Sequence, residues 1–408
     1  MRVAKPSCLK LAILVLALAG VACSGNGAAT GVAGAAGTNS GGTASTTTPS
    51  TGGSTISTGG TAATGGRMTT TSVGGTMTTG GTPGNGGTTT NRDAGAGGAT
   101  STGGTSTGTC GTINMHPFSN CQFAWGAPNS GNRSSYLNFV STWVGQEANG
   151  GLSSMSATAT NTSCNGCSLA RSVASGNAMA VFYAYFIGFD GHAAGLPDCN
   201  VAGPPNLCSN ASQWVRDNRA ILINQYAQYA KAVYAASPNK PVIWWLEGDF
   251  VQYTYSGQIN AFTYAELGQL ARDITCAIKS NEPNAVVAMN HSPWIADNIS
   301  TAFWSAMPMD VIDMVWVQGP GNSDAFVNAG SYNATTANYA WISQKTGRTI
   351  LAETSYAGSG SDDLWTTTTV ANINARIAHG VIGVLVNNPA SNYQTAIGAL
   401  TPLTATCH

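Results

Sequence analysis

The sequence predicts an α/β protein, a (β/α)8 TIM barrel preceded by a disordered Gly/Thr/Ser-rich linker. Short apolar runs of strand length alternate with longer segments whose apolar residues recur close to the helical period of 3.6. About eight such units fall in about 300 residues, which favours a closed barrel over an open doubly wound sheet. All ten Trp lie between Trp125 and Trp365, so this part of the chain contains the core.

The predicted strands are almost entirely apolar, as strands buried on both faces of a parallel sheet are. They lie at 122–125, 178–186, 241–246, 285–289, 311–317, 349–352 and 381–386, with a weaker candidate at 156–160. The helical patterns between them cover 214–236, 264–279, 334–345 and 369–379. The last two stop at Gly347 and Gly380, as helix ends prefer.

Residues 1–22 are predicted to be a signal peptide, because basic residues precede an apolar run too short to span a bilayer comfortably. The run ends in Gly20-Val21-Ala22-Cys23, which resembles the signal of bacterial lipoproteins, whose Cys becomes the lipidated first residue. Ordinary cleavage after Ala22 also fits, since Gly20 and Ala22 are both small. Both alternatives predict a secreted or cell-surface protein, attached to a membrane only through a lipid anchor at Cys23.

Residues 23–108 are predicted to be a flexible linker. They are almost entirely Gly, Thr, Ser and Ala and contain no Phe, Trp or Tyr. Such a segment cannot bury enough apolar surface to offset its ordering entropy. Its r.m.s. span would be roughly 50 Å, enough to hold a domain formed by residues 109–408 away from a cell surface.

The charge composition excludes several classes of partner. Only 8% of the residues are charged and the net charge is −1, which argues against nucleic acid and against a polybasic membrane contact. No dinucleotide or P-loop motif follows a predicted strand, and His192 and His291 are not spaced like metal ligands. We therefore expect a monomer that needs no cofactor and no metal.

Eight of the ten Cys lie in residues 109–408, and an even count in an exported chain predicts disulfides. The preferred pairs are Cys110–Cys121, Cys199–Cys208 and Cys276–Cys407. Cys164 and Cys167 form a CxxC motif without a second one or a nearby His pair. A tight-loop disulfide is therefore favoured there over a redox or zinc site.

Two glutamates stand out among the five in this domain. Glu247 and Glu353 each close an apolar strand, at the end where barrels carry their catalytic residues. A carboxylate in such a place is costly without a partner. Of the eleven Lys and Arg in the domain, the only one near either strand is Arg348, at the opposite end of its strand. A catalytic role is therefore favoured over an ion pair at the barrel rim.

If the weaker strand is counted, Glu247 ends the fourth strand and Glu353 the seventh. In this order and spacing the sequence resembles the clan A retaining glycoside hydrolases. The resemblance implies a (β/α)8 enzyme that hydrolyses O-glycosyl bonds of a polysaccharide such as a β-1,4-glucan, with Glu247 as acid/base and Glu353 as nucleophile. The clan's usual Asn before the acid/base is Leu246 here, so Asn290 or Asn387 would contact the sugar 2-hydroxyl.

The spacing of the two carboxyl groups would decide the stereochemistry. About 5 Å gives retention through a glycosyl-enzyme, whereas roughly 6.5–9.5 Å leaves room for water and gives inversion. Apolar neighbours of Glu247 would raise its pKa, as an acid requires. Asp249 and Asp190 are alternative acids, and either would favour inversion.

Other polar and aromatic residues at or just past strand ends are predicted to bind the sugar, whose C–H faces pack on aromatic rings. The predicted substrate-binding residues are Trp125, Tyr185, Asp190, Asp249, Asn290, His291, Trp294, Trp316, Gln318 and Asn387.

Two further functions stay open. A carbohydrate-binding or surface-adhesion protein could reuse the barrel without catalysis. An esterase or deacetylase acting on polysaccharide substituents is the other, although no GxSxG motif occurs.

Overall fold

The structure is a computed structural model. It describes residues 110–129, 135–147, 163–199, 201, 203–293, 295–318, 337–354, 370–400 and 402–405. The predicted signal peptide and linker, the strand candidate at 156–160 and Trp294 lie outside the described residues. The described domain begins at Cys110.

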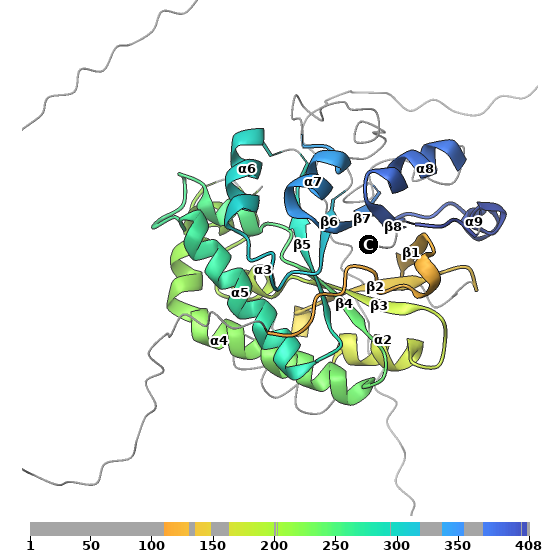
Figure 1. Cartoon of the computed structure of the whole chain (residues 1–408). Coiled ribbons are helices and arrows are strands. Elements are labelled where there is room, and N and C mark those ends of the chain that lie inside the picture. Colours follow the sequence, from red (N-terminus) through yellow and green to blue (C-terminus); the bar gives the residue numbers. More distant parts are fainter. Residues whose placement is uncertain are drawn as a thin grey trace, which may run out of the picture. The chain divides into compact units, whose positions relative to one another are not determined.

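Eight parallel strands form a closed barrel in chain order (Figure 1). They are β1 (Ala124–Pro128), β2 (Phe139–Val144), β3 (Met179–Ala184), β4 (Val242–Leu246), β5 (Val286–His291), β6 (Met314–Val317), β7 (Thr349–Glu353) and β8 (Val381–Leu385). The barrel closes where β8 pairs with β1, with Trp125 opposite Val384. This confirms the predicted fold class, and the numbering places Glu247 after β4 and Glu353 at the end of β7.

Strand β2 is the one that the apolar pattern did not reveal. Its sequence, Phe-Val-Ser-Thr-Trp-Val, is interrupted by Ser141 and Thr142, which are only partly buried, and by the exposed Trp143. Its neighbour β3 is buried along its whole length. A strand whose middle meets solvent lacks the continuous apolar run used to find the others.

Helices cover the outside of the barrel (Figure 1). They are α2 (Asn165–Val173), α3 (Phe186–Ala193), α4 (Leu207–Ala236), α5 (Tyr264–Asn281), α6 (Asp297–Ala306), α7 (Tyr339–Thr346), α8 (Val370–Ala378) and α9 (Tyr393–Leu400), with 3-10 turns η1 (Ser119–Cys121) and η3 (Phe250–Thr254). Helix α7 ends at Gly347, whose φ of 64° suits a residue without Cβ. Within the described residues, no helix is both long enough and apolar enough to cross a membrane.

The disulfides correct part of the predicted pairing. Cys164–Cys167 and Cys199–Cys208 are confirmed. The pairs Cys110–Cys121 and Cys276–Cys407 are wrong, because Cys110 is bonded to Cys276 across 166 residues. Spacing suggested a local pair, but the segment after Cys110 packs on α5, where Lys279 donates to the carbonyl of Thr112 at 3.1 Å. These disulfides are typical of a protein that folds outside the cytoplasm.

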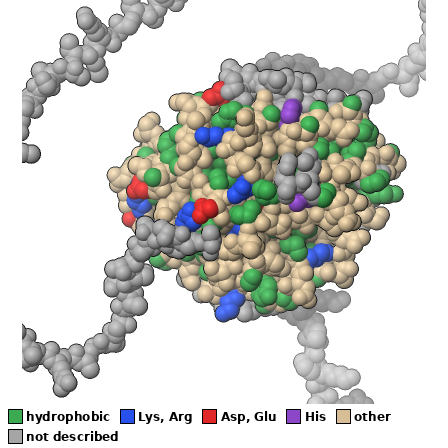
Figure 2. All heavy atoms as spheres, in the orientation of Figure 1, with side chains coloured by type: hydrophobic (Ala, Val, Ile, Leu, Met, Phe, Trp, Pro, Cys, Tyr) green, Lys and Arg blue, Asp and Glu red, His purple; other side chains and the backbone are tan. Residues whose placement is uncertain are grey.

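Charged side chains are few and scattered on the face shown in Figure 2. Ion pairs on the surface of the described domain, such as Arg272 with Asp310 and Arg219 with Asp273, are partly exposed. This face carries no broad charged patch of the kind that binds a polyanion.

Candidate active site

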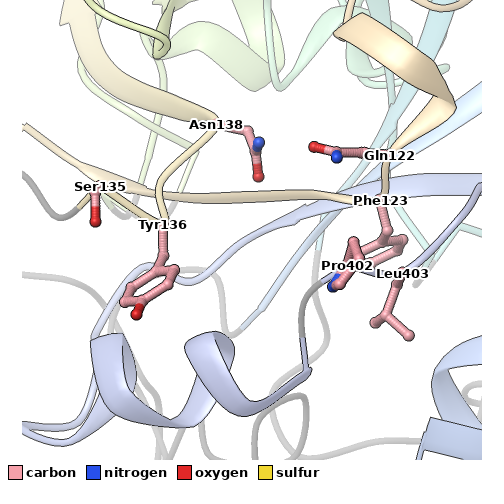
Figure 3. A pocket seen from close by; sticks show the side chains of 7 residues that line it. All are labelled: Gln122, Phe123, Ser135, Tyr136, Asn138, Pro402 and Leu403. Carbon is pink, nitrogen blue, oxygen red and sulfur yellow. The ribbon is translucent and has the colours of Figure 1, made fainter.

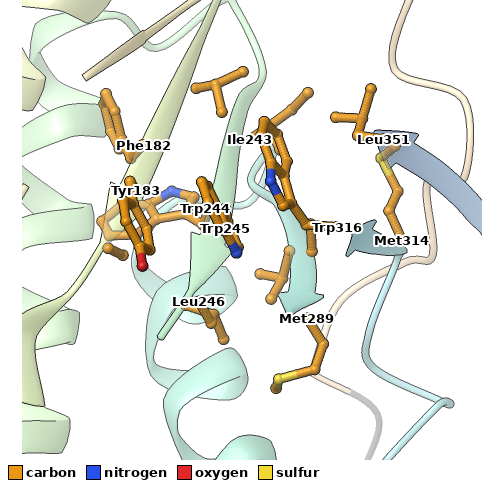
Figure 4. Packing of buried hydrophobic residues seen from close by; sticks show 14 of the residues in the cluster. Phe182, Tyr183, Ile243, Trp244, Trp245, Leu246, Met289, Met314, Trp316 and Leu351 are labelled. Carbon is orange, nitrogen blue, oxygen red and sulfur yellow. The ribbon is translucent and has the colours of Figure 1, made fainter. Parts of the chain in front are cut away.

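The carboxyl ends of the eight strands meet at one mouth of the barrel, and a row of aromatic rings crosses it. Tyr183 of β3 stacks on Trp245 of β4 with ring centroids 3.9 Å apart, and Trp245 stacks on Trp316 of β6 at 4.4 Å (Figure 4). Trp143 of β2 continues the row beyond Tyr183. Tyr183, Trp245 and Trp316 are buried and fill the barrel. Trp143, at the outer end of the row, is 40% exposed.

Glu353 lies at the inner end of this row. Its Oε2 accepts a hydrogen bond from the indole Nε1 of Trp316 at 3.1 Å, and its Oε1 accepts one from the side-chain amide of Asn387. The amide of Asn387 also donates to the carbonyl of Thr354. The three predicted site residues Glu353, Trp316 and Asn387 are therefore brought together by β6, β7 and the chain after β8.

Glu247 lies after β4 but faces away from this group. Its backbone φ is +36°, a conformation that is uncommon for a residue with a Cβ. Its Oε1 accepts from the backbone N–H of Ile187 at 2.9 Å and from the hydroxyl of Tyr226, on α3 and α4. The carboxyl group is fully buried, and this burial raises its pKa to about 8, although both hydrogen bonds act in the opposite direction. Glu247 thus sits between β4 and the helix layer.

Asp249, two residues after Glu247 in the segment between β4 and η3, lies at the mouth. Its Oδ2 lies 2.7 Å from the hydroxyl oxygen of Tyr185, and its Oδ1 accepts from the amide of Gln252 at 2.8 Å. It remains partly exposed. Burial raises its pKa, the hydrogen bond with Tyr185 acts in the opposite direction, and the negative charge of Asp198 adds to the rise. Between the two acids, Gly248 passes so close to Tyr183 that a Cβ there would lie 2.2 Å from the phenol oxygen.

Tyr185 links Asp249 to two residues that the sequence analysis did not select. Its hydroxyl lies 3.3 Å from Oδ1 of Asp198, and that oxygen lies 2.7 Å from Nε2 of His192. The hydrogen bond from His192 lowers the pKa of Asp198. Asp198 follows a loop rather than a strand, so no periodic pattern marks it. Its proximity to Cys199 was the one available signal.

A polar cluster occupies the neighbouring part of the mouth. Asn290 accepts from the indole of Trp245 at 3.0 Å and donates to the carbonyl of Gly248 at 2.8 Å. Gln318 accepts from the hydroxyl of Ser292 at 2.9 Å. Predicted residues Asn290 and Gln318 therefore lie together, next to the aromatic row.

Three other predicted residues face the helix layer. Trp125 is buried against Phe123 and against Tyr393 of α9. His291 accepts from the indole of Trp304 on α6, and burial lowers its pKa to about 3. Beside His291 lies a void of about 10 Å³, too small for a sugar ring. Asp190 lies within α3, where burial raises its pKa to about 7 and the amide of Gln225 partly offsets that rise.

A larger cavity of about 180 Å³ lies elsewhere (Figure 3). Gln122, Phe123, Ser135, Tyr136, Asn138, Pro402 and Leu403 line it. These residues precede β1 and β2 or belong to the C-terminal segment, so the cavity lies at the amino end of the strands. It contains none of the predicted site residues. Among the described residues, no group of His, Cys, Asp and Glu could hold a metal ion.

Comparisons with known proteins give likenesses in structure only. No protein-family model and no curated protein matches the sequence. A GH26 β-mannanase from Bacteroides ovatus has a TM-score of 0.46 and 13% identity, covering 69% of this chain and 89% of that chain. A GH26C structure from Muricauda sp. has a TM-score of 0.46 and 14% identity over 69% and 84% of the two chains. A modular endo-β-1,4-mannanase from Cellulomonas fimi has a TM-score of 0.45 and 12% identity over 70% and 72%.

Proposed function

We propose that this protein is a glycoside hydrolase that cleaves a polysaccharide outside the cytoplasm, with Glu353 and Asp249 as its two catalytic carboxyl groups. The observation that carries the proposal is the contrast between these acids at the mouth of one barrel. Burial raises the pKa of Asp249, whose Oδ2 contacts a hydroxyl group that can accept a proton, whereas both oxygens of Glu353 contact N–H donors, which cannot accept one. Glycosidic bond cleavage needs one carboxyl group that gives a proton and one that attacks or activates water.

Asp249 is assigned as the general acid. A group that remains protonated to higher pH can protonate the leaving oxygen as the bond breaks. Glu353 is assigned as the carboxylate that attacks the anomeric carbon or activates water, because an ionised carboxylate accepts two N–H donors. This assignment moves the acid role from Glu247, the sequence-based candidate, to the next acid in the chain.

Glu247 is assigned a positioning role. Its carboxyl group has no described contact at the mouth and joins β4 to α3 and α4 through Ile187 and Tyr226. A proton donor must reach the glycosidic oxygen within hydrogen-bond distance. Glu247 is fully buried behind the strand, whereas Asp249 is partly exposed, which favours Asp249 for this role.

The substrate is assigned from the surroundings of the two acids. Trp143 offers an exposed aromatic surface beside Tyr183 and Tyr185. An exposed aromatic face suits the C–H surface of a sugar ring. The low charge of the chain agrees with a neutral polysaccharide, for which β-1,4-glucan and β-1,4-mannan are the first candidates to assay.

The test is release of reducing ends from a panel of neutral polysaccharides. Asp249→Asn and Glu353→Gln should each lower kcat by about 10³-fold or more, while Glu247→Gln should retain measurable turnover. Asp217→Asn, on the exposed face of α4, is the matched control and should leave turnover unchanged. Circular dichroism and melting temperature would establish that each variant folds.

Two results would overturn the assignment. Full activity of Asp249→Asn together with loss in Glu247→Gln would return the acid role to Glu247. Tight glycan binding with no turnover in the native protein, unaffected by replacing either acid, would indicate a carbohydrate-binding protein instead.

A further inference from the structure

Four side chains form a continuous chain of contacts that runs from solvent to Asp249. His192 lies 2.7 Å from Asp198, Asp198 lies 3.3 Å from the hydroxyl of Tyr185, and that hydroxyl lies 2.7 Å from Asp249. The outer pair is accessible, with the side chains of His192 and Asp198 exposed by 31% and 51%. Of the inner pair, Tyr185 is buried and Asp249 is partly exposed.

The number of protons that these four side chains can share indicates whether Asp249 is protonated. A phenol has one O–H to donate, yet Tyr185 lies between two carboxyl groups. If both were ionised, only one could receive that proton, and two negative charges would stand within about 6 Å of each other. If Asp249 carries a proton, every donor has an acceptor. Asp249 then donates to Tyr185, Tyr185 donates to Asp198, and His192 donates to Asp198 from the other side.

We propose that His192 and Asp198 are positioning residues that act through Tyr185 to keep Asp249 protonated, so that it can serve as the general acid. The proposal rests on the function proposed above, since it explains how that acid is maintained. Asp198 supplies the negative charge that opposes ionisation of Asp249. The hydrogen bond from His192 favours the ionised form of Asp198. The positive charge of His192 lowers the pKa of Asp249 and so partly offsets the effect of Asp198.

The disulfide Cys199–Cys208 holds this arrangement together. Cys199 directly follows Asp198, and the two sulfur atoms lie 2.9 and 3.1 Å from Oε1 of Gln252. The amide nitrogen of Gln252 donates to Asp249. The disulfide therefore helps to position two residues around Asp249. Gln252 contacts Asp249 directly, and Asp198 contacts it through the phenol of Tyr185.

The other titratable groups facing Asp249 come from neighbouring segments. Glu247 of the same loop, and Tyr253 and Tyr255 in and after η3, all experience its charge. Glu247 is uncharged near neutral pH, because its pKa is about 8, and burial raises the pKa of both tyrosines above their usual range. Asp198 is therefore the neighbouring group that carries a negative charge near neutral pH, because the hydrogen bond from His192 lowers its pKa.

The test is a ¹³C NMR titration of the full chain labelled at the Asp carboxyl carbon, with the Asp249 signal identified by its loss in Asp249→Asn. Asp198→Asn should lower the titration midpoint of Asp249 by about one pH unit, because a neighbouring negative charge is removed. His192→Gln should raise that midpoint, because the compensating positive charge is lost. Asp217→Asn is the control and should not move it.

Opposite shifts in the two variants cannot arise from general loosening of the site. Shifts in the same direction, or no shift, would overturn the proposal. The alkaline limb of kcat/KM on the polysaccharide that proves to be the substrate should move with the NMR midpoint. If Asp249→Asn keeps full activity while the midpoints shift as expected, the proposed function fails but the coupling between these residues stands.

Discussion

At the scale of single residues, the segment Glu-Gly-Asp after β4 directs two acids that are only two positions apart to different sides of the strand. The left-handed backbone of Glu247 sends its side chain behind the strand, and the close approach of Gly248 to Tyr183 lets Asp249 reach the mouth. The result is one carboxyl group buried among Ile187 and Tyr226 and one beside Tyr185.

The buried Glu247 predicts a specific dependence of stability on pH. Its pKa is about 8 in the folded protein and about 4.5 when unfolded, so the folded state binds one proton more between these values. Its contribution to stability is complete below pH 4.5 and is lost as the pH rises towards 8. In this window Glu247 makes the unfolding free energy fall by roughly 1 kcal/mol for each unit of rising pH. We expect that part of the fall to be absent in Glu247→Gln.

Urea denaturation at several pH values would measure that slope. Asp190, whose pKa is about 7, contributes in the same direction and remains in the variant, so part of the slope should persist. An unchanged slope in Glu247→Gln would show that Glu247 ionises as readily in the folded protein as in the unfolded chain.

Trp143 predicts an effect on binding rather than on chemistry. Its exposed ring lies beside Tyr185 but contacts neither Asp249 nor Glu353 in the structure. Replacing it by Ala should raise KM about tenfold, or about 1.4 kcal/mol, with a smaller change in kcat. Steady-state kinetics on a soluble polysaccharide would measure both constants, and a fall in kcat alone would contradict this role.

At the scale of elements, local sequence signals set where helices begin. Thr263 precedes α5 and accepts from the backbone of Glu266 at 3.2 Å, while the carboxylate of Glu266 accepts from the backbone of Thr263 at 2.8 Å. This reciprocal capping satisfies two backbone donors that the first turn of a helix would otherwise leave unpaired. The apolar pattern located α5, and the capping residues fix its first turn.

Thr263→Ala should therefore lower the unfolding free energy by about 1 kcal/mol, which corresponds to a fall in melting temperature of about 2 °C. Activity should not change, because α5 carries no residue of the candidate site. Thr301→Ala, at an exposed position within α6, is the matched control and should leave the melting temperature unchanged or slightly higher. Equal losses in both variants would refute the capping role.

At the scale of the whole domain, the N-terminal segment is tied to the amino end of the barrel. The disulfide Cys110–Cys276 is reinforced by Lys279, which donates to Thr112 and forms a buried ion pair with Asp313 at 2.8 Å. Asp313 also accepts from the backbone of Asn114. The disulfide thereby closes a covalent loop that contains β1 to β4, α2 to α4 and most of α5, and it lies at the end away from the candidate site.

Removing that disulfide should destabilise the protein without affecting catalysis. Loop-closure entropy for a separation of 166 residues gives an upper value of about 5 kcal/mol for Cys110→Ser/Cys276→Ser. The separation of 9 residues in Cys199–Cys208 gives about 2.5 kcal/mol for the corresponding pair of changes. Urea denaturation should show the larger loss in the first variant, and reducing-end assays should show an activity loss only in the second.

Predictability differed between the two glutamates that the sequence singled out. Glu353 ends a regular strand, and its position at the mouth could be expected from strand order alone. Glu247 appeared equivalent, but one residue with positive φ reverses where the side chain points, and no periodic pattern encodes that reversal. Asp198 and His192 lie outside the strands, so strand-end reasoning could not find them.

The sequence by itself determined the barrel, because about eight strand–helix units, seven of them marked by an apolar strand, have few ways to bury both faces of a parallel sheet. It also determined which strand ends carry acids. Only the tertiary structure decided which acid faces the mouth, which aromatic rings stack there, and that Cys110 bonds with Cys276. Those features depend on side-chain direction and on contacts between distant segments, whereas local patterns of hydrophobicity report only which residues are buried.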